Sequence, residues 1–176
     1  DEARDRQLGD LLLGALEELH EWSLHIYTSQ TEAQVAQYGI YGPKVFYHKH
    51  VNQSEAYAQH RSADVLFLPL AFRSTIQEVL VTSAPMKMGE YLASGRPILV
   101  HAPPDTFIAK HIRQHRAGVV IDKPDSHALA SALRDIASNA ELRQSIYMNA
   151  ITLAAEYNVE RARDTFWNTV EATARD

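Results

Sequence analysis

"SAPMKMGEYLASGRPILV", residues 83–100, is the stretch of this 176-residue chain that decides its fold. Pro85 suits the entry to a helix, because its fixed φ fits the first turn and its missing N–H is not needed there. We therefore expect a helix over about residues 86–94, followed by an apolar strand over residues 97–102. Glu90 stands about one turn into that helix, and its charge raises the question of a ligand.

Short apolar runs alternate with helical segments along the chain. Strands are expected at residues 22–29, 43–51, 64–70, 97–102 and 118–122. Helices are expected at residues 5–20, 30–39, 52–63, 86–94, 105–114, 125–138, 140–157 and 159–174. Strict alternation of this kind is typical of parallel strands joined by right-handed crossovers. The sequence therefore predicts an α/β fold, a doubly wound, Rossmann-like parallel sheet flanked by helices.

Three segments refine this prediction. Residues 64–70, DVLFLPL, are nearly all apolar, as expected for a strand buried on both faces of a parallel sheet. Residues 71–85 show no clear period and are expected to form a long loop. The opening helix has no strand before it and the chain starts at Asp1 rather than at a Met, so we expect a first strand upstream of this sequence.

Composition excludes several classes of protein. Hydrophobic residues make up 45% of the chain and charged residues 22%, which is typical of one folded globular domain. The net charge is -5 and no basic stripe is present, so a nucleic-acid partner is not expected. The absence of cysteine excludes disulfides, thiolate metal sites and cysteine nucleophiles. No apolar run approaches the roughly 20 residues that cross a bilayer.

The helix over residues 86–94 follows a strand, and doubly wound sheets bind ligands at the carboxyl ends of their strands. Free N–H groups and the positive end of the helix dipole would favour an anion at its start. Lys87 adds a cation, Gly89 would let a ligand approach the backbone, and Glu90 could accept hydrogen bonds from vicinal hydroxyls. These features suit a nucleotide. The alternative is structural, because acidic residues are favoured in a first helical turn and Gly89 could serve packing alone.

At these residues the sequence resembles the C-terminal, donor-binding domain of GT-B glycosyltransferases of the retaining group 1 family. The resemblance covers about residues 44–170. It rests on five stretches in order, SADVLFLP (62–69), KMGEYLASGRPILV (87–100), AGVVID (117–122), DSHALASALRDIASNAELRQSI (125–146) and YNVERARDTFW (157–167).

The resemblance implies a binding site for a nucleotide-sugar donor. Glu90 would hold the ribose hydroxyls, the helix start would face the diphosphate, and the loop over residues 48–52 would border the base. The residues so implied are Thr82, Ser83, Lys87, Met88, Gly89, Glu90, His50 and Val51. Family members use no metal-dependent nucleotide clamp, so neither a metal nor another cofactor is expected beside the donor.

The resemblance also implies the place of this chain in a larger enzyme. Residues 1–176 would form the C-terminal domain, and the acceptor side would come from an N-terminal domain of the same polypeptide. We therefore predict that the isolated chain has no transferase activity. We expect the full enzyme to be cytoplasmic, and it could associate peripherally with a membrane.

The sequence departs from the family pattern before the proposed site. Many members carry a second glutamate where this chain has Thr82, and residues 71–84 lack the usual glycines. Two alternatives therefore stay open. One is a GT-B-like sugar-nucleotide epimerase, with His101 and Asp105 as candidate acid–base groups, and the other is a non-catalytic interaction domain. Two histidine pairs, His48 with His50 and His111 with His115, lack a carboxylate at metal spacing, so no metal site is predicted.

Overall fold

The computed structural model describes residues 2–72 and 76–173, and it describes the side chains of these residues except 2–7, 159 and 162. The described residues form the strands β1 (Leu24–Thr28), β2 (Val45–Lys49), β3 (Leu66–Pro69), β4 (Ile98–His101) and β5 (Val119–Ile121). The helices before β4 are α1 (Glu2–Glu18), α2 (Glu32–Ala36), α3 (Gln53–Ser62), α4 (Gln77–Thr82) and α5 (Lys87–Ser94). Those after β4 are α6 (Phe107–His115), α7 (Ser126–Ser138), α8 (Ala140–Ala154), the 3-10 helix η1 (Ala155–Tyr157) and α9 (Val159–Thr173).

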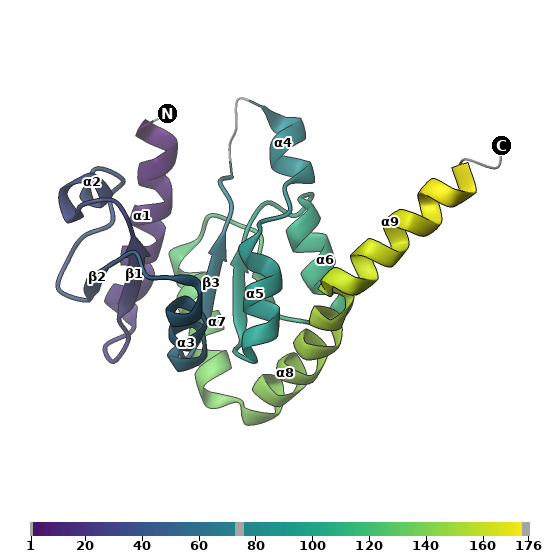
Figure 1. The fold of residues 1–176 in the computed structure, drawn as a ribbon. Coiled ribbons are helices and arrows are strands. Elements are labelled where there is room, and N and C mark those ends of the chain that lie inside the picture. Colours follow the sequence, from purple (N-terminus) through teal and green to yellow (C-terminus); the bar gives the residue numbers. More distant parts are fainter. Residues whose placement is uncertain (1, 73–75, 174–176) are drawn as a thin grey trace.

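All strand pairs are parallel, which confirms the predicted α/β class. The described strands nevertheless form two sheets instead of one, with orders β1-β2 and β3-β4-β5. In Figure 1 the β1–β2 sheet lies at the left and the β3–β5 sheet lies in the centre. Within the described residues, no hydrogen-bonded pairing joins β1 to β3.

Two apolar clusters cover the two faces of the β3–β5 sheet. On one face, Leu68, Ile98 and Val100 pack with buried residues of α5, α6 and α8. On the other face, Leu99 packs with α1 and α7, including Ala15 and Leu129. Burial of this kind on both faces is expected for a parallel sheet and explains why β4 is apolar from Ile98 to Val100.

Local sequence signals set several helix ends. Asn52 and Glu55 form a capping box at the start of α3, and the Asp125 carboxylate accepts backbone N–H bonds at the start of α7. Gly95 ends α5 in the left-handed region, with φ 74°. A Cβ there would lie 2.9 Å from the Tyr147 ring of α8, so both the backbone and the packing require glycine.

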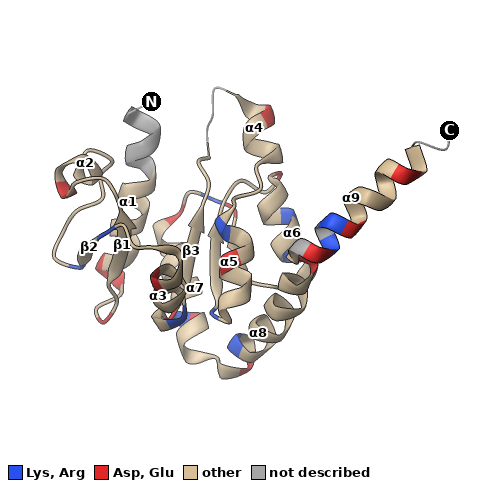
Figure 2. Ribbon diagram, in the orientation of Figure 1, with Lys and Arg blue, Asp and Glu red and all other residues tan. Residues whose placement is uncertain are grey.

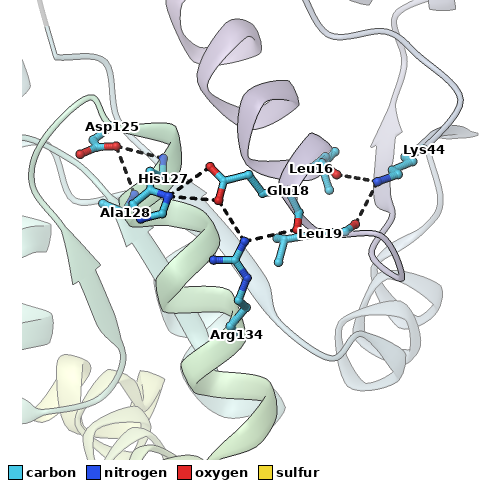
Figure 3. Close-up of polar contacts among 8 residues, drawn as sticks. All are labelled: Leu16, Glu18, Leu19, Lys44, Asp125, His127, Ala128 and Arg134. Carbon is cyan, nitrogen blue, oxygen red and sulfur yellow. Dashed lines mark hydrogen bonds and ion pairs between the residues drawn. The ribbon is translucent and has the colours of Figure 1, made fainter.

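The last turn of α1 is fixed on two sides, as Figure 3 shows. Glu18 accepts a hydrogen bond from Arg134 of α7 at 2.9 Å and lies 3.1 Å from Nδ1 of His127. On the other side, Lys44 donates from Nζ to the carbonyl oxygens of Leu16 and Leu19, at 2.6 and 3.0 Å. Since Lys44 directly precedes β2, α1 links the β1–β2 sheet to the layer that covers the β3–β5 sheet.

Two segments differ from expectation. The predicted loop over residues 71–85 contains a short helix, α4, which is anchored by the buried side chain of Leu80. Helix α9 forms as predicted but extends away from the rest of the fold (Figure 1), and the side chains described on it are exposed. In the described ranges no helix combines the length and apolarity needed to cross a membrane.

Candidate functional site

The candidate site lies at the start of α5, beyond the carboxyl end of β3. Met86, the residue that precedes this helix, makes no side-chain cap hydrogen bond and is 95% exposed. The first-turn N–H groups of α5 are therefore not capped by a side chain, which leaves the positive end of the helix dipole available to an anion. Figure 2 shows a basic and an acidic position on α5, which the sequence identifies as Lys87 and Glu90.

Glu90 lies near enough to His60 of α3 to influence it electrostatically, which the sequence did not predict. His60 of α3 stacks edge-on against Tyr91 of α5 at a ring separation of 4.9 Å. Burial lowers the pKa of His60, while the nearby Glu90 carboxylate opposes this shift and Lys87 adds to it. Burial, helped by Glu90, raises the pKa of Tyr91. The structure thus brings Lys87 and Glu90 together with His60, an additional residue of the site.

His60 has one further property. Its Nδ1 atom is buried and has no hydrogen-bond partner among the described residues. Nothing in the sequence marked His60, because it lies in the last turn of α3, where a basic residue is favourable for the helix dipole alone.

Two of the predicted ligand residues on α5 have contacts of their own within the fold. The side chain of Met88 is only 2% exposed and packs in the core, and its N–H donates to the Pro85 carbonyl oxygen at 2.9 Å. The Met88 side chain therefore serves the core, and its predicted place beside the diphosphate stays a prediction. A Cβ at Gly89 would lie 3.9 Å from the Tyr157 Cβ, an ordinary van der Waals distance. The position of a Cβ at Gly89 is directed toward Tyr157, which supports the alternative that this glycine serves packing.

Thr82 and Ser83 connect α4 to the loop before α5. Thr82 is the last residue of α4, and its hydroxyl donates to the Glu78 carbonyl oxygen at 2.7 Å. Its oxygen can still accept a hydrogen bond from a ligand. Ser83 follows in extended backbone and is half-buried. Both residues precede Pro85 closely enough to border the α5 start.

His50 and Val51 lie between β2 and the Asn52 cap of α3. His50 is exposed and Val51 is half-buried. Helix α3 packs beside α5, since Arg96 donates to the Arg61 carbonyl oxygen at 2.6 Å in addition to the His60–Tyr91 contact. Within the described residues, no hydrogen bond or ion pair joins His50 or Val51 to α5. Their predicted place beside the base stays a prediction.

His101, at the carboxyl end of β4, is fully buried at 0% exposure. Its Nε2 lies 2.9 Å from the Lys123 carbonyl oxygen, and its Nδ1 has no partner in the described residues. Burial lowers the pKa of His101 below its ordinary value. The side chain of Asp105 is 83% exposed and lies 4.0 Å from Lys110. A buried histidine and an exposed carboxylate give no support to the acid–base pair of an epimerase.

The histidine pairs have other partners. His25 and His48 are hydrogen-bonded at 2.9 Å across β1 and β2 and stack in parallel, while His111 is hydrogen-bonded to the Tyr157 hydroxyl at 2.8 Å. Among the side chains that the structure describes, no three His, Asp or Glu residues are grouped so that they could hold a metal ion. The predicted lack of a metal in the full enzyme stays a prediction.

The fold and this site define a parallel α/β domain that has an uncapped helix start, a lysine and a glutamate at one sheet edge. Residues 4–139 match the family of glycosyl transferases group 1. The chain therefore belongs to this family. No curated protein matches it by sequence.

Two solved structures show the same fold. WaaG, a glycosyltransferase involved in lipopolysaccharide biosynthesis, is similar to 85% of this chain, with a TM-score of 0.57 and 23% identity. The C-terminal domain of LpcC, a group 1 family glycosyl transferase from Francisella tularensis, is similar to 88% of it, with a TM-score of 0.58 and 15% identity. The matches span 38% of the WaaG chain and 79% of the LpcC chain. They confirm the predicted fold class.

Proposed function

We propose that this chain is the donor-binding domain of a retaining group 1 glycosyltransferase and forms the C-terminal half of a GT-B enzyme. In the proposed reaction, the bond between the sugar C1 and the diphosphate oxygen of an NDP-sugar breaks. A bond forms between C1 and an acceptor hydroxyl oxygen, the hydroxyl proton is lost and the nucleoside diphosphate leaves. The observation that carries the proposal is the uncapped α5 start with Lys87 and Glu90 in its first turn.

The proposed roles follow from the charged side chains and the backbone N–H donors at the start of α5. The leaving diphosphate would lie on the α5 N–H groups beside Lys87, which stabilise negative charge without a metal. Glu90 would accept hydrogen bonds from the ribose hydroxyls. Thr82 and Ser83 would border the phosphates, and His50 and Val51 the base. The backbone near Gly89 would lie close to the diphosphate, while Met88 supports the helix from the core.

The proposal includes a partner domain. The acceptor would be held by an N-terminal domain of the same polypeptide, so residues 1–176 alone should bind a nucleotide and transfer no sugar. The proposal also includes a cytoplasmic enzyme that contacts a membrane surface peripherally. Sugar transfer by the purified 176-residue chain would contradict the predicted need for a second domain.

Calorimetry with UDP, GDP and ADP tests the donor site. We expect one of these nucleotides to bind, and Glu90→Gln to weaken binding at least about tenfold through the lost carboxylate hydrogen bonds. Glu141→Gln is the matched control, because Glu141 also lies in the first turn of a helix, α8, on another part of the fold. Equal loss in both variants, or none in Glu90→Gln, would contradict the assignment of Glu90.

One observation favours a second candidate function. Thr82 stands where many family members have a glutamate, and its hydroxyl is bonded within α4. A domain that keeps the fold but no longer handles a sugar would fit this difference. If the folded chain, and a longer protein that includes its partner domain, bind none of the three nucleotides, the interaction domain is the better description. Exchange of a proton at a sugar carbon would instead support an epimerase.

A further inference from the structure

Helix α5 is contacted near both of its ends by a tyrosine that lies over a glycine. A Cβ at Gly95, which ends the helix, would be 2.9 Å from the Tyr147 ring, and a Cβ at Gly89 would be 3.9 Å from the Cβ of Tyr157. The two tyrosines are similarly accessible, at 42% and 44% exposure. Tyr157 is placed beside the first turn of α5, where the candidate site lies.

The hydroxyl of Tyr157 is bound to a second helix. It is hydrogen-bonded to Nε2 of His111 of α6 at 2.8 Å, and the two rings meet edge to face at a separation of 6.2 Å. The His111 ring also contacts the rings of Phe107 and His115, at 4.9 and 4.6 Å. Burial lowers the pKa of His111, His115 lowers it further, and Glu156 opposes the shift. Burial raises the pKa of Tyr157, so a neutral phenol bonds a neutral imidazole near pH 7.

The backbone on either side of Tyr157 is held as well. Tyr157 ends η1, which continues α8 directly, and α8 is anchored in the core by Ala150 and Leu153. On the other side, the Asn158 side chain accepts a hydrogen bond from the Glu160 N–H at 2.7 Å, at the start of α9. Tyr157 thus connects α5, α6 and the end of α8 at one point.

The first turn of α5 is supported on two sides. On the core side, Met88 is 2% exposed and packs in a cluster with residues of α6 and α8. On the solvent side, Tyr157 lies against Gly89. Met86, which precedes the helix, is 95% exposed and makes no side-chain cap bond. Because no side-chain cap fixes the helix start, its direction depends on packing of this kind.

We infer that Tyr157 is a positioning residue for the α5 start, since its ring holds the first turn and its bond to His111 holds the ring. Backbone N–H groups stabilise an anion from about 2.7–3.1 Å, so a small tilt of the helix would weaken the interaction. Tyr157 acts through α5 and is assigned no contact with the nucleotide. The inference rests on the proposed function, which places the diphosphate at this turn.

Hydrogen exchange tests the positioning without a ligand. The Tyr91 N–H bonds the Lys87 carbonyl oxygen in the first turn of α5, since helix N–H groups bond four residues back. In Tyr157→Ala this amide should exchange at least about fivefold faster than in the wild type, because the turn opens more easily. Tyr147→Ala is the matched control, because it removes a similarly exposed tyrosine from the other end of the same helix.

The control variant separates local from global loosening. Tyr147→Ala should leave exchange at Tyr91 within about twofold of the wild type, after urea unfolding has corrected both variants for global stability. No acceleration in Tyr157→Ala, or equal acceleration in both variants, would overturn the inference.

Calorimetry connects the turn to binding. With whichever of UDP, GDP and ADP binds the wild type, Tyr157→Ala should weaken binding at least about fivefold and Tyr147→Ala less than about twofold. Tyr157→Phe keeps the ring over Gly89 and should retain binding within about threefold. If Tyr157→Ala binds the diphosphate as well as the wild type does, the inference is wrong. If the wild type binds none of the three, the proposed function is wrong, and the exchange results alone decide whether Tyr157 positions α5.

A double-mutant cycle tests the bond to His111. His111→Phe removes Nε2 but keeps a ring that can stack on Phe107. Tyr157→Phe and His111→Phe should each speed exchange at Tyr91 about two- to threefold. The double variant should show no more than the larger single effect, because both substitutions break the same bond. Effects that multiply in the double variant would show that the two residues act independently and would overturn the role assigned to this bond.

Discussion

Glu18 of α1 accepts a 2.9 Å hydrogen bond from Arg134 of α7, a residue 116 positions further along the chain. Nδ1 of His127, also on α7, lies 3.1 Å from an oxygen of the same carboxylate. The Arg134 bond is the largest influence on Glu18 and holds its pKa below the ordinary value, despite an opposing effect of desolvation. The pair therefore ties the first helix to the second half of the fold, and it does so most strongly when the carboxyl is ionised.

Glu18→Gln should lower the free energy of unfolding at neutral pH. The folded pKa lies below 4.5, so the stabilisation is present above 4.5 and is lost as the pH falls through the folded value. The difference between wild type and variant should thus shrink in acid. Urea unfolding across this pH range measures it, with Glu17→Gln, an exposed neighbour, as control. A difference that is independent of pH would contradict the role of the ionised carboxylate.

A second prediction concerns His101. Burial lowers its pKa below the ordinary 6.5, so the unfolded chain binds a proton more readily than the folded chain just below this pH. The free energy of unfolding should therefore fall as the pH drops below 6.5. His60 and His111 shift in the same direction through burial and should contribute as well.

His101→Gln removes one titrating group and keeps a side chain that can bond the Lys123 carbonyl oxygen. The variant should be less stable by about 1–3 kcal/mol near neutral pH and should show a shallower decline below 6.5. Thermal unfolding at several pH values checks both effects. A slope identical to that of the wild type would exclude His101 as a source of the pH dependence.

The part of the fold that the sequence predicts best is the part that local signals control. Pro85 and Gly95 mark the ends of α5, and the apolar β4 sequence marks a strand buried on two faces. These features depend on a few neighbouring residues, so one sequence is enough to identify them. The same holds for Lys87 and Glu90, whose place on the helix follows from counting residues.

Features that depend on distant residues are not visible in the sequence. Helix α4 has β-branched Val79 and Val81, which favour strands, and it is anchored by the burial of Leu80. The contact between His60 and Tyr91 joins two helices that are far apart in the sequence. The division into two sheets is also invisible in the sequence, because strands and helices alternate in the same way whether or not β1 pairs with β3. Such contacts are set by tertiary packing, which local periodicity does not encode.

Two glycine substitutions should have opposite effects on stability. Gly9→Ala places a Cβ 2.4 Å from a backbone oxygen, and backbone cannot move aside as a side chain can. We expect a loss at the upper end of about 1–3 kcal/mol. In Gly89→Ala the added Cβ would contact only Tyr157, whose Cβ lies 3.9 Å away. This substitution should be neutral or stabilise α5 by up to about 1 kcal/mol. Urea unfolding compares the two, and equal losses would contradict the packing described for α1.

Lys87 should matter for the phosphates and not for the nucleoside. It is exposed at the first position of α5, where it adds a cation to the uncapped helix start. Lys87→Gln should weaken binding of a nucleoside diphosphate about five- to tenfold at low salt and less at high salt, because exposed charges are screened. Binding of the parent nucleoside should not change.

Arg161→Gln is the matched control for Lys87→Gln, because it removes one exposed positive charge on another helix, α9. Calorimetry at two salt concentrations separates a local effect from one of net charge. If both variants weaken the diphosphate equally, the attraction comes from the overall charge of the domain. If Lys87→Gln also weakens the nucleoside, Lys87 acts on the shape of the site, and the assignment of the α5 start to the diphosphate would be wrong.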